Sequence, residues 1–127
     1  HSFPTRRSSD LEAVPSVQPT DSFSDLMREM SAKGLGASAI VDAQQHVLGI
    51  FTDGDLRRLI EKGTDMRALT AQQVMHANPR TVRAHALAAE AAELMELHRI
   101  TSVLVVDEQG VLCGAINTND LMRAKVI

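Results

Sequence analysis

The sequence predicts an α/β (α+β) fold built from two copies of one strand–strand–helix unit. The main support is a gapless self-similarity, in which residues 65 positions apart match: Met30 with Met95, Asp42 with Asp107, Gly49 with Gly114 and Asp55 with Asp120. Helical and β patterns also follow the same order in both copies. Because a small sheet with helices on one face cannot bury both faces alone, we expect the copies to pack sheet to sheet with pseudo-twofold symmetry. Such packing places two related clefts between them.

The first copy is expected to contain a helix, two strands and a second helix. Apolar residues at helical spacing predict the first helix, with N-cap candidates at residues 20–22 and a stop at Gly34; the stripe is Phe23, Leu26, Met27 and Met30. Strands are predicted at Ser38–Val41 and His46–Phe51, because these β-rich runs flank a turn that begins at Asp42. A helix from about Gly54 to Lys62 follows.

The second copy repeats this order. Its elements are a helical stripe of Leu87, Ala91, Leu94 and Met95, strands at Ser102–Val106 and Val111–Ile116, and a closing helix at Asn119–Lys125. Between the copies, Thr70 and Gln73 have the spacing of a capping box, which predicts a short helix ending near Met75. An extended piece is expected at Thr81–Val82. Each copy is therefore expected to form a sheet of two or three strands.

Composition excludes several classes of function. The chain has 127 residues, of which 44% are hydrophobic, so it can bury an ordinary globular core. Aromatic residues make up 2% and the formal net charge is −3, which argues against a nucleic-acid partner. No apolar run has the length of a membrane span, so no membrane partner is expected. The lone Cys113 cannot form an internal disulfide, and without a secretory signal we expect a cytoplasmic protein.

Catalytic and metal sites are not predicted. The five histidines form no pair at i, i+4 spacing and no cluster with the spacing of metal ligands. No pair of residues has the pattern of a general base and its partner, so neither a catalytic residue nor a cofactor is expected in this chain. Residues 1–11 are polar and lack periodicity, and we interpret them as a disordered or non-native leader outside the fold.

Three segments resemble a known family. The strand-to-helix segment Gly49–Arg58, its counterpart Gly114–Leu121 and the lead-in Ile100–Asp107 are similar to the signature of cystathionine-β-synthase (CBS) domains. The resemblance covers roughly residues 12–127, as a first repeat at 12–68, truncated at its N-terminus, and a second at 69–127. Together with Lys33–Gly36 and the C-terminal Asp120–Ile127, the chain is most similar to the C-terminal region of arabinose-5-phosphate isomerases, in which a sugar-isomerase domain precedes a CBS pair.

The resemblance implies a regulatory module that senses a nucleotide or sugar nucleotide, with an adenine or cytidine nucleotide as the candidate ligand. It implies ligand binding by Thr52, Asp55, Asn117 and Asp120. The alternative for the two aspartates is a purely structural place in the first turn of a helix, where a carboxylate is favoured. Asn117 lacks the hydroxyl group of Thr52, so the two clefts are expected to be unequal.

The resemblance also implies partners and a pathway. The partners are an N-terminal sugar-isomerase domain and further copies of the chain, as a homodimer or higher oligomer. The family interconverts ribulose 5-phosphate and arabinose 5-phosphate for 3-deoxy-manno-octulosonate and lipopolysaccharide synthesis. Two alternatives stay open: a structural dimerisation module without a ligand, and the CBS pair of another enzyme or of a stand-alone protein.

Overall fold

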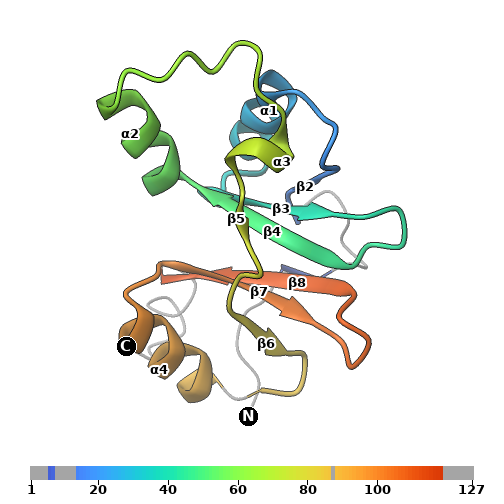
Figure 1. Cartoon of the computed structure of the whole chain (residues 1–127). Helices are drawn as coiled ribbons and strands as arrows, with labels where there is room; N and C mark the ends of the chain where they lie inside the picture. Colours follow the sequence, from blue (N-terminus) through green and yellow to red (C-terminus); the bar gives the residue numbers. More distant parts are fainter. Residues whose placement is uncertain (1–5, 8–13, 87, 119–127) are drawn as a thin grey trace. The chain divides into compact units, whose positions relative to one another are not determined.

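The computed structural model of the chain describes residues 6–7, 14–86 and 88–118. Its internal contacts divide the chain into two compact units. The first unit is Pro15–Pro79, and the second unit combines His1–Val14 with Arg80–Ile127. Each unit contains a four-stranded sheet with helical segments beside it, as Figure 1 shows. The mixed α+β fold of two like repeats is therefore confirmed.

The first unit has the sheet order β2-β3-β4-β5. Strand β2 (Ser16–Val17) runs parallel to β3 (Ala37–Val41), and β3 is antiparallel to β4 (Val47–Thr52), which is antiparallel to β5 (His76–Ala77). Three helices lie beside one face of this sheet (Figure 1): α1 (Phe23–Lys33), α2 (Asp53–Glu61) and α3 (Ala71–Val74).

The second unit has the order β1-β8-β7-β6. Strand β6 (Thr81–Arg83) is parallel to β7 (Ser102–Val106), which is antiparallel to β8 (Leu112–Asn117), and β8 is antiparallel to β1 (Arg6–Arg7). Helix α4 (Ala88–His98) contributes the buried Ala91 and Met95 to a core that also contains residues of β7 and β8.

Strand register confirms the repeat residue by residue. Ala37 pairs with Thr52 in the first unit, and Ser102 pairs with Asn117 in the second. Both hairpins also carry a register shift at the same place, after Ile40 and after Val105. Each of these positions in the second unit lies 65 residues after its counterpart in the first. The two hairpins therefore have the same strand register.

The core of the first unit forms where the helix α1 meets the sheet. The Ser22 hydroxyl accepts a hydrogen bond from the Asp25 N–H at 3.1 Å and so caps the N-terminus of α1, while Gly34 ends the helix in the left-handed conformation, with φ of 66°. Leu26 and Phe51 are fully buried, and the rings of Phe23 and Phe51 meet edge to face with centroids 5.7 Å apart. The predicted caps and apolar stripe of this helix are confirmed.

The edge strands β1 and β5 differ from the expectation of two or three strands in each sheet. In the first unit Ala77 pairs with Gly49, and in the second Arg7 pairs with the equivalent Gly114. The interpretation of residues 1–11 as a leader outside the fold is therefore wrong for Arg6–Arg7. A strand of two residues is too short to show hydrophobic alternation, so the sequence pattern does not predict it.

The boundary between the units also differs from the expected division at residues 68 and 69. The α3 residue Ala71 is fully buried in the core of the first unit, with Leu26 and Phe51, and β5 extends the sheet of that unit. Residues 69–79 therefore pack on the first unit of the structure. The predicted closing helix at 119–125 and the predicted core position Leu87 lie outside the described residues.

None of the helices in the described part of the chain has the length and apolar character needed to cross a membrane.

We expect Gly49→Ala to lower the free energy of unfolding by about 1–3 kcal/mol. A Cβ atom at this position would lie 2.8 Å from Met75 Cγ and 3.0 Å from the backbone oxygen of His76, so the segment that leads into β5 would have to move. Urea unfolding followed by circular dichroism measures the loss. Gly54→Ala is the matched control, because its nearest neighbours would lie 3.5 Å or more away, and alanine favours a helix. Equal losses in the two variants would contradict this packing.

Candidate functional site

The junction between β4 and α2 brings together two of the predicted ligand-binding residues. Thr52 is the last residue of β4 and the N-cap of α2. Its Oγ1 accepts a hydrogen bond from the Asp55 N–H at 3.2 Å, and Oδ2 of Asp55 accepts one from the Thr52 N–H at 3.0 Å. These reciprocal bonds form a capping box, which satisfies two N–H groups that the helix itself leaves without a partner. The structure thus fixes the Thr52 and Asp55 side chains against each other.

Arg58 adds a positive charge to this junction. Its guanidinium group donates a hydrogen bond to Oδ1 of Asp55 at 2.6 Å, in an ion pair with i,i+3 spacing. A Cβ atom added to Gly54 would lie 3.5 and 3.6 Å from the two terminal guanidinium nitrogens of Arg58. The Asp55 side chain keeps 20% of its surface exposed and that of Arg58 keeps 60%. The helix start therefore presents a hydroxyl, a carboxylate and a guanidinium group side by side.

The Asp55 carboxylate retains capacity for further hydrogen bonds. An ionised carboxylate has about four acceptor positions, and the junction uses one on each oxygen. Helix N-termini favour negative charge, and a charged carboxylate there is able to accept bonds from hydroxyl groups. The geometry is compatible with two roles for Asp55, capping of α2 and acceptance of hydrogen bonds from a ligand diol.

The equivalent junction in the second unit is described in part. Asn117 ends β8, is half-buried, and takes the place that Thr52 has in the first unit. Beyond it, the Thr118 N–H donates to the Thr101 oxygen at 2.9 Å. Asp120, the fourth predicted ligand-binding residue, lies outside the described residues. The structure therefore brings together Thr52 and Asp55, and places Asn117 at the matching strand end.

Arg58 joins the predicted Thr52 and Asp55 at this junction. Its ion pair with Asp55 has a signal in the sequence, because residues three apart on a helix are neighbours and these two carry opposite charges. The pair changes the chemistry of the junction. A carboxylate alone would repel a ligand phosphate, whereas the guanidinium group beside it attracts one.

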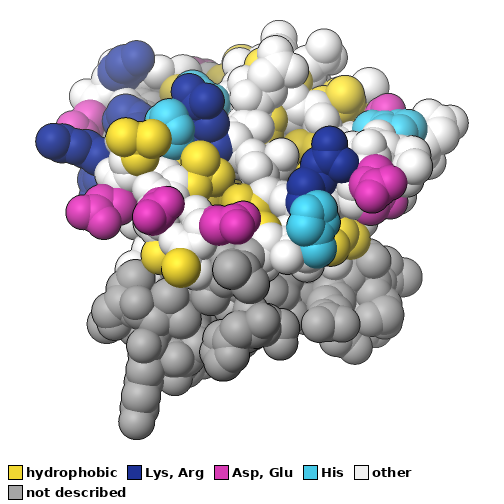
Figure 2. All heavy atoms as spheres, turned by 90° about the horizontal axis from the view of Figure 1, so that it is seen from below, with side chains coloured by type: hydrophobic (Ala, Val, Ile, Leu, Met, Phe, Trp, Pro, Cys, Tyr) yellow, Lys and Arg dark blue, Asp and Glu magenta, His cyan; other side chains and the backbone are white. Residues whose placement is uncertain are grey.

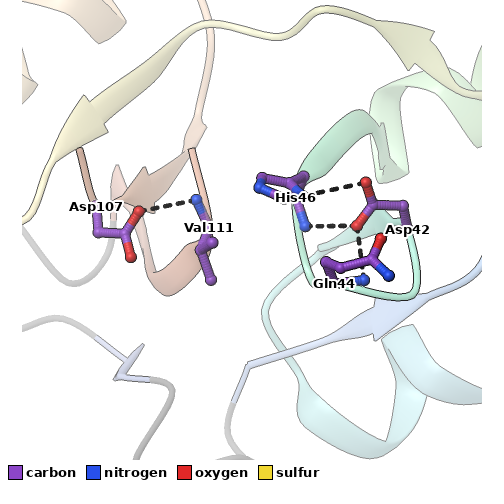
Figure 3. Close-up of polar contacts among 5 residues, drawn as sticks. All are labelled: Asp42, Gln44, His46, Asp107 and Val111. Carbon is purple, nitrogen blue, oxygen red and sulfur yellow. Dashed lines mark hydrogen bonds and ion pairs between the residues drawn. The ribbon is translucent and has the colours of Figure 1, made fainter. Parts of the chain in front are cut away.

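The two hairpin turns confirm that the repeat extends to side-chain detail (Figure 3). Oδ1 of Asp42 accepts hydrogen bonds from the Gln44 and His46 N–H groups, both at 2.9 Å. Oδ1 of Asp107 accepts from the Gln109 N–H at 2.8 Å and from the Val111 N–H at 3.0 Å. In both turns the aspartate carboxylate takes the place of a backbone acceptor and closes the loop. Asp42 and Asp107 therefore have the same structural role.

His46 makes the first hairpin turn different from the second. Its Nδ1 lies 3.2 Å from Oδ2 of Asp42, whereas Val111 holds the equivalent place in the second turn (Figure 3). Among the described residues, no three His, Cys, Asp or Glu side chains come together in a way that could hold a metal ion. The His46–Asp42 contact is thus a two-residue pair at a turn, with both side chains partly exposed.

Comparison with known protein families gives two matches to one domain model along the chain. The model described as "CBS domain" matches residues 9–62 and again residues 71–127. The chain belongs to the CBS domain family. Both matches include the strand-to-helix junction of a repeat, so the junctions described above are the corresponding positions of two CBS domains.

Similar proteins extend this assignment. The chain is 44% identical over 116 residues to "Arabinose 5-phosphate isomerase KdsD" of Pseudomonas aeruginosa, a match that covers 91% of this chain and 36% of that protein. The chain thus spans about a third of the length of this relative. Among solved structures, "CBSX2 in complex with AMP" matches with a TM-score of 0.80 at 21% identity, covering 96% of this chain and 92% of that one. "CBS domain protein PAE2072 from Pyrobaculum aerophilum complexed with AMP" matches with a TM-score of 0.80 at 22% identity, covering 94% and 97%.

We expect the contribution of Asp42 to stability to depend on pH. Chiefly because its carboxylate accepts the hydrogen bond of the His46 N–H, the pKa of Asp42 lies below its ordinary value of 3.8, although desolvation acts in the opposite direction. A carboxyl group whose folded-state pKa is lowered stabilises the fold above its unfolded-state value, and this contribution is lost as the pH falls through the folded-state pKa. Asp42→Asn should therefore lower the urea unfolding midpoint at neutral pH, and the difference from the unmodified chain should shrink in acid.

The matched control for this experiment is Glu108→Gln, which removes one exposed carboxylate from the other hairpin turn. Its unfolding midpoint should equal that of the unmodified chain at both pH values. A difference for Asp42→Asn that stays constant from neutral pH to below about pH 3.8 would contradict the prediction.

Proposed function

We propose that this chain is a regulatory CBS pair that binds an adenine or cytidine nucleotide, or a sugar nucleotide, at its strand-to-helix junctions. The observation that carries the proposal is the paired geometry of Thr52 and Asp55, which holds a carboxylate with unused acceptor positions at the start of α2. In this proposal Thr52 and Asp55 bind the ligand in the first unit, and Asn117 and Asp120 do so in the second.

The chemistry of the first junction suits a ribose phosphate. A ribose diol offers two adjacent O–H donors, and a hydrogen bond to a charged acceptor contributes about 1.5–3 kcal/mol. Asp55 can accept such bonds without leaving the capping box, because its oxygens each retain a free acceptor position. The Thr52 hydroxyl and the Arg58 guanidinium group can donate to phosphate oxygens. The capping box holds the carboxylate in place before a ligand arrives, which lowers the entropic cost of binding.

The ligand class is supported by proteins of the same fold. Two of the similar solved structures are complexes with AMP. Because Asn117 stands where the first unit has Thr52, we propose that the second junction binds its ligand less tightly than the first or takes a different one. A ligand that binds one conformation better than another shifts the balance between them, which is how such a module would regulate an attached protein.

The parent protein is proposed to be an arabinose-5-phosphate isomerase of the cytoplasm, active in the 3-deoxy-manno-octulosonate branch of lipopolysaccharide synthesis. The support is the identity of 44% to such an isomerase over the matched 36% of its length. Catalysis is then the task of a sugar-isomerase domain N-terminal to this chain, and regulation is the task of the CBS pair. Reading the coding sequence upstream of this chain tests the proposal directly, and an unrelated upstream domain would refute it.

We expect a nucleotide ligand to raise the melting temperature of the chain. A ligand that binds only the folded state adds about 2.7 kcal/mol to the free energy of unfolding at about one hundred times its Kd. For a chain of this size, that gain raises the melting temperature by about 10 °C. Thermal unfolding with AMP, CMP and the cytidylyl-activated octulosonate measures the shift. If none of them changes the melting temperature at millimolar concentration, the ligand-sensing proposal fails.

Two variants separate ligand binding from capping. Asp55→Ala should cost about 1 kcal/mol through loss of the cap and should also abolish the nucleotide shift. Gln73→Ala is the matched control, because Gln73 holds the same position in the capping box of α3, where its Oε1 accepts from the Thr70 N–H at 2.9 Å. It should cost similar stability and keep the full shift. A shift that survives in Asp55→Ala would exclude Asp55 from the ligand site.

A second candidate function is a structural dimerisation module that binds no ligand. The observation in its favour is that Asp55 is already bonded within the chain, to Thr52 and to Arg58. In that case the Asp55→Ala variant would lose stability alone, and sedimentation would show the same dimer with and without nucleotide.

A further inference from the structure

Met75 lies at the point where helix α3 of the first unit gives way to the edge strand β5. It is the C-cap of α3, its N–H donates to the Ala71 oxygen at 2.9 Å, and its own backbone is already extended, with ψ of 152°. The two residues of β5 follow directly and pair with Gly49 and Ile50 of β4. A change that moves the Met75 side chain therefore acts on the start of β5.

The Met75 thioether packs on the backbone of β4. A Cβ atom added to Gly49 would lie 2.5 Å from Met75 Sδ and 2.8 Å from its Cγ, so the sulfur occupies the space that a side chain at this position would need. Met75 also contacts the core of the first unit. Residues 76–78 are exposed. Apart from its backbone hydrogen bonds, the segment after α3 is therefore held to β4 by the apolar contact of Met75.

The Met75 side chain is also within reach of small molecules in water. It is half-buried, as are Met27 and Met66 at the edge of the same core, whereas Met30 is buried. Peroxides oxidise exposed thioethers to sulfoxides. Met27 lies inside α1 and Met66 in the loop between α2 and α3. Met75 differs from both because it packs on the strand with which β5 pairs.

The second unit has no equivalent thioether among its described residues. Its described methionine, Met95, is 5% exposed and belongs to the core. Helix α4 has Glu93 and Leu97 exposed instead, and on the face that carries α4 acidic side chains lie next to hydrophobic atoms (Figure 2). The strand that corresponds to β5 is β1, and both of its residues are arginines. Sensitivity of an edge strand to oxidation is therefore expected in the first unit.

We propose that Met75 is a site of reversible oxidation by peroxides and that its sulfoxide releases β5 from β4. The sulfur lone pair attacks one oxygen of hydrogen peroxide, an S–O bond forms and the O–O bond breaks. The proton of the transferred O–H group passes to the departing hydroxide, which leaves as water, so the sulfur is oxidised and the peroxide is reduced. Because a sulfoxide is polar, the side chain no longer favours the apolar contact at Gly49. The proposal does not rest on the ligand proposed above.

Release of β5 changes the covalent connection between the units. Residues 75–79 lead from the first unit to the second, which resumes at Arg80. With β5 unpaired, this connection gains conformational freedom, and β4 loses its partner at Gly49 and Ile50, close to the Thr52 that caps α2. Methionine sulfoxide reductases restore the thioether. The contact between Met75 and Gly49 therefore has the properties of a redox switch.

Hydrogen exchange at one amide tests the release. The Asn78 N–H donates to the Leu48 oxygen at 3.1 Å, so its exchange rate reports whether the segment stays on β4. After peroxide treatment of the chain, NMR spectra should show about tenfold faster exchange at Asn78. Treatment with the two methionine sulfoxide reductases, one for each epimer, should restore the original rate. The Asp107 N–H, which donates to the Val111 oxygen in the second unit at 3.0 Å, should keep its rate throughout.

Variants assign the effect to one sulfur atom. Met75→Leu keeps an apolar side chain of similar size without a thioether, so peroxide should leave its Asn78 exchange unchanged. Met66→Leu is the matched control, because Met66 is half-buried against the same core, and this variant should keep the full response. All chains carry Cys113→Ala, which removes oxidation of the thiol. Peptide mass spectrometry measures the oxygen added at each methionine.

The outcomes separate the switch from general oxidative damage. Complete oxidation of Met75 without faster exchange at Asn78 overturns the proposal. So does a response that persists in Met75→Leu or disappears in Met66→Leu. Equal acceleration at Asp107 would show loss of the whole fold and would contradict a local release. A Met75 that stays a thioether while Met27 and Met66 are oxidised also refutes the assignment.

Discussion

The pairing register of the β3–β4 hairpin is the constraint on which the first unit depends. The Asp42 carboxylate closes the turn, and the register then places Thr52 opposite Ala37 at the end of β4. A slip of one residue would turn the buried Phe51 to the opposite face of the sheet, away from the core that its ring shares with Leu26. Because Thr52 is also the N-cap of α2, the turn at one end of the strand decides where the helix at the other end begins.

The second unit keeps the same register and changes the residue at its end. Asp107 closes its turn as Asp42 does, and Asn117 pairs as Thr52 does. Duplication has thus preserved the backbone hydrogen bonds, which every copy needs, while the side chain at the junction differs. At the junction of the first unit, one carboxylate serves the helix and retains acceptor positions for a second partner. A capping residue is well suited to this because its orientation is fixed by folding.

Helix ends, caps and turns could be predicted from the sequence where residues of a suitable type occur at the required spacing. Gly34, which follows the apolar stripe, predicted the end of α1, and Thr70 with Gln73 predicted the capping box of α3. The 65-residue repeat predicted that Asp42 and Asp107 are equivalent. The sequence did not reveal the edge strands, because two residues contain too little hydrophobic alternation to be recognised. It also did not show that α3 packs on the first unit, since the burial of Ala71 depends on tertiary contacts.

Strand β1 has a consequence for the modularity of the pair. It precedes the whole first unit in the chain, yet it pairs with β8 and completes the sheet of the second unit. The second compact unit is thus not a contiguous stretch of sequence, and excising it at the midpoint of the chain would expose the edge of its sheet. An unpaired edge is a template for aggregation. A domain fused ahead of the pair would therefore have to leave this strand free to reach its sheet.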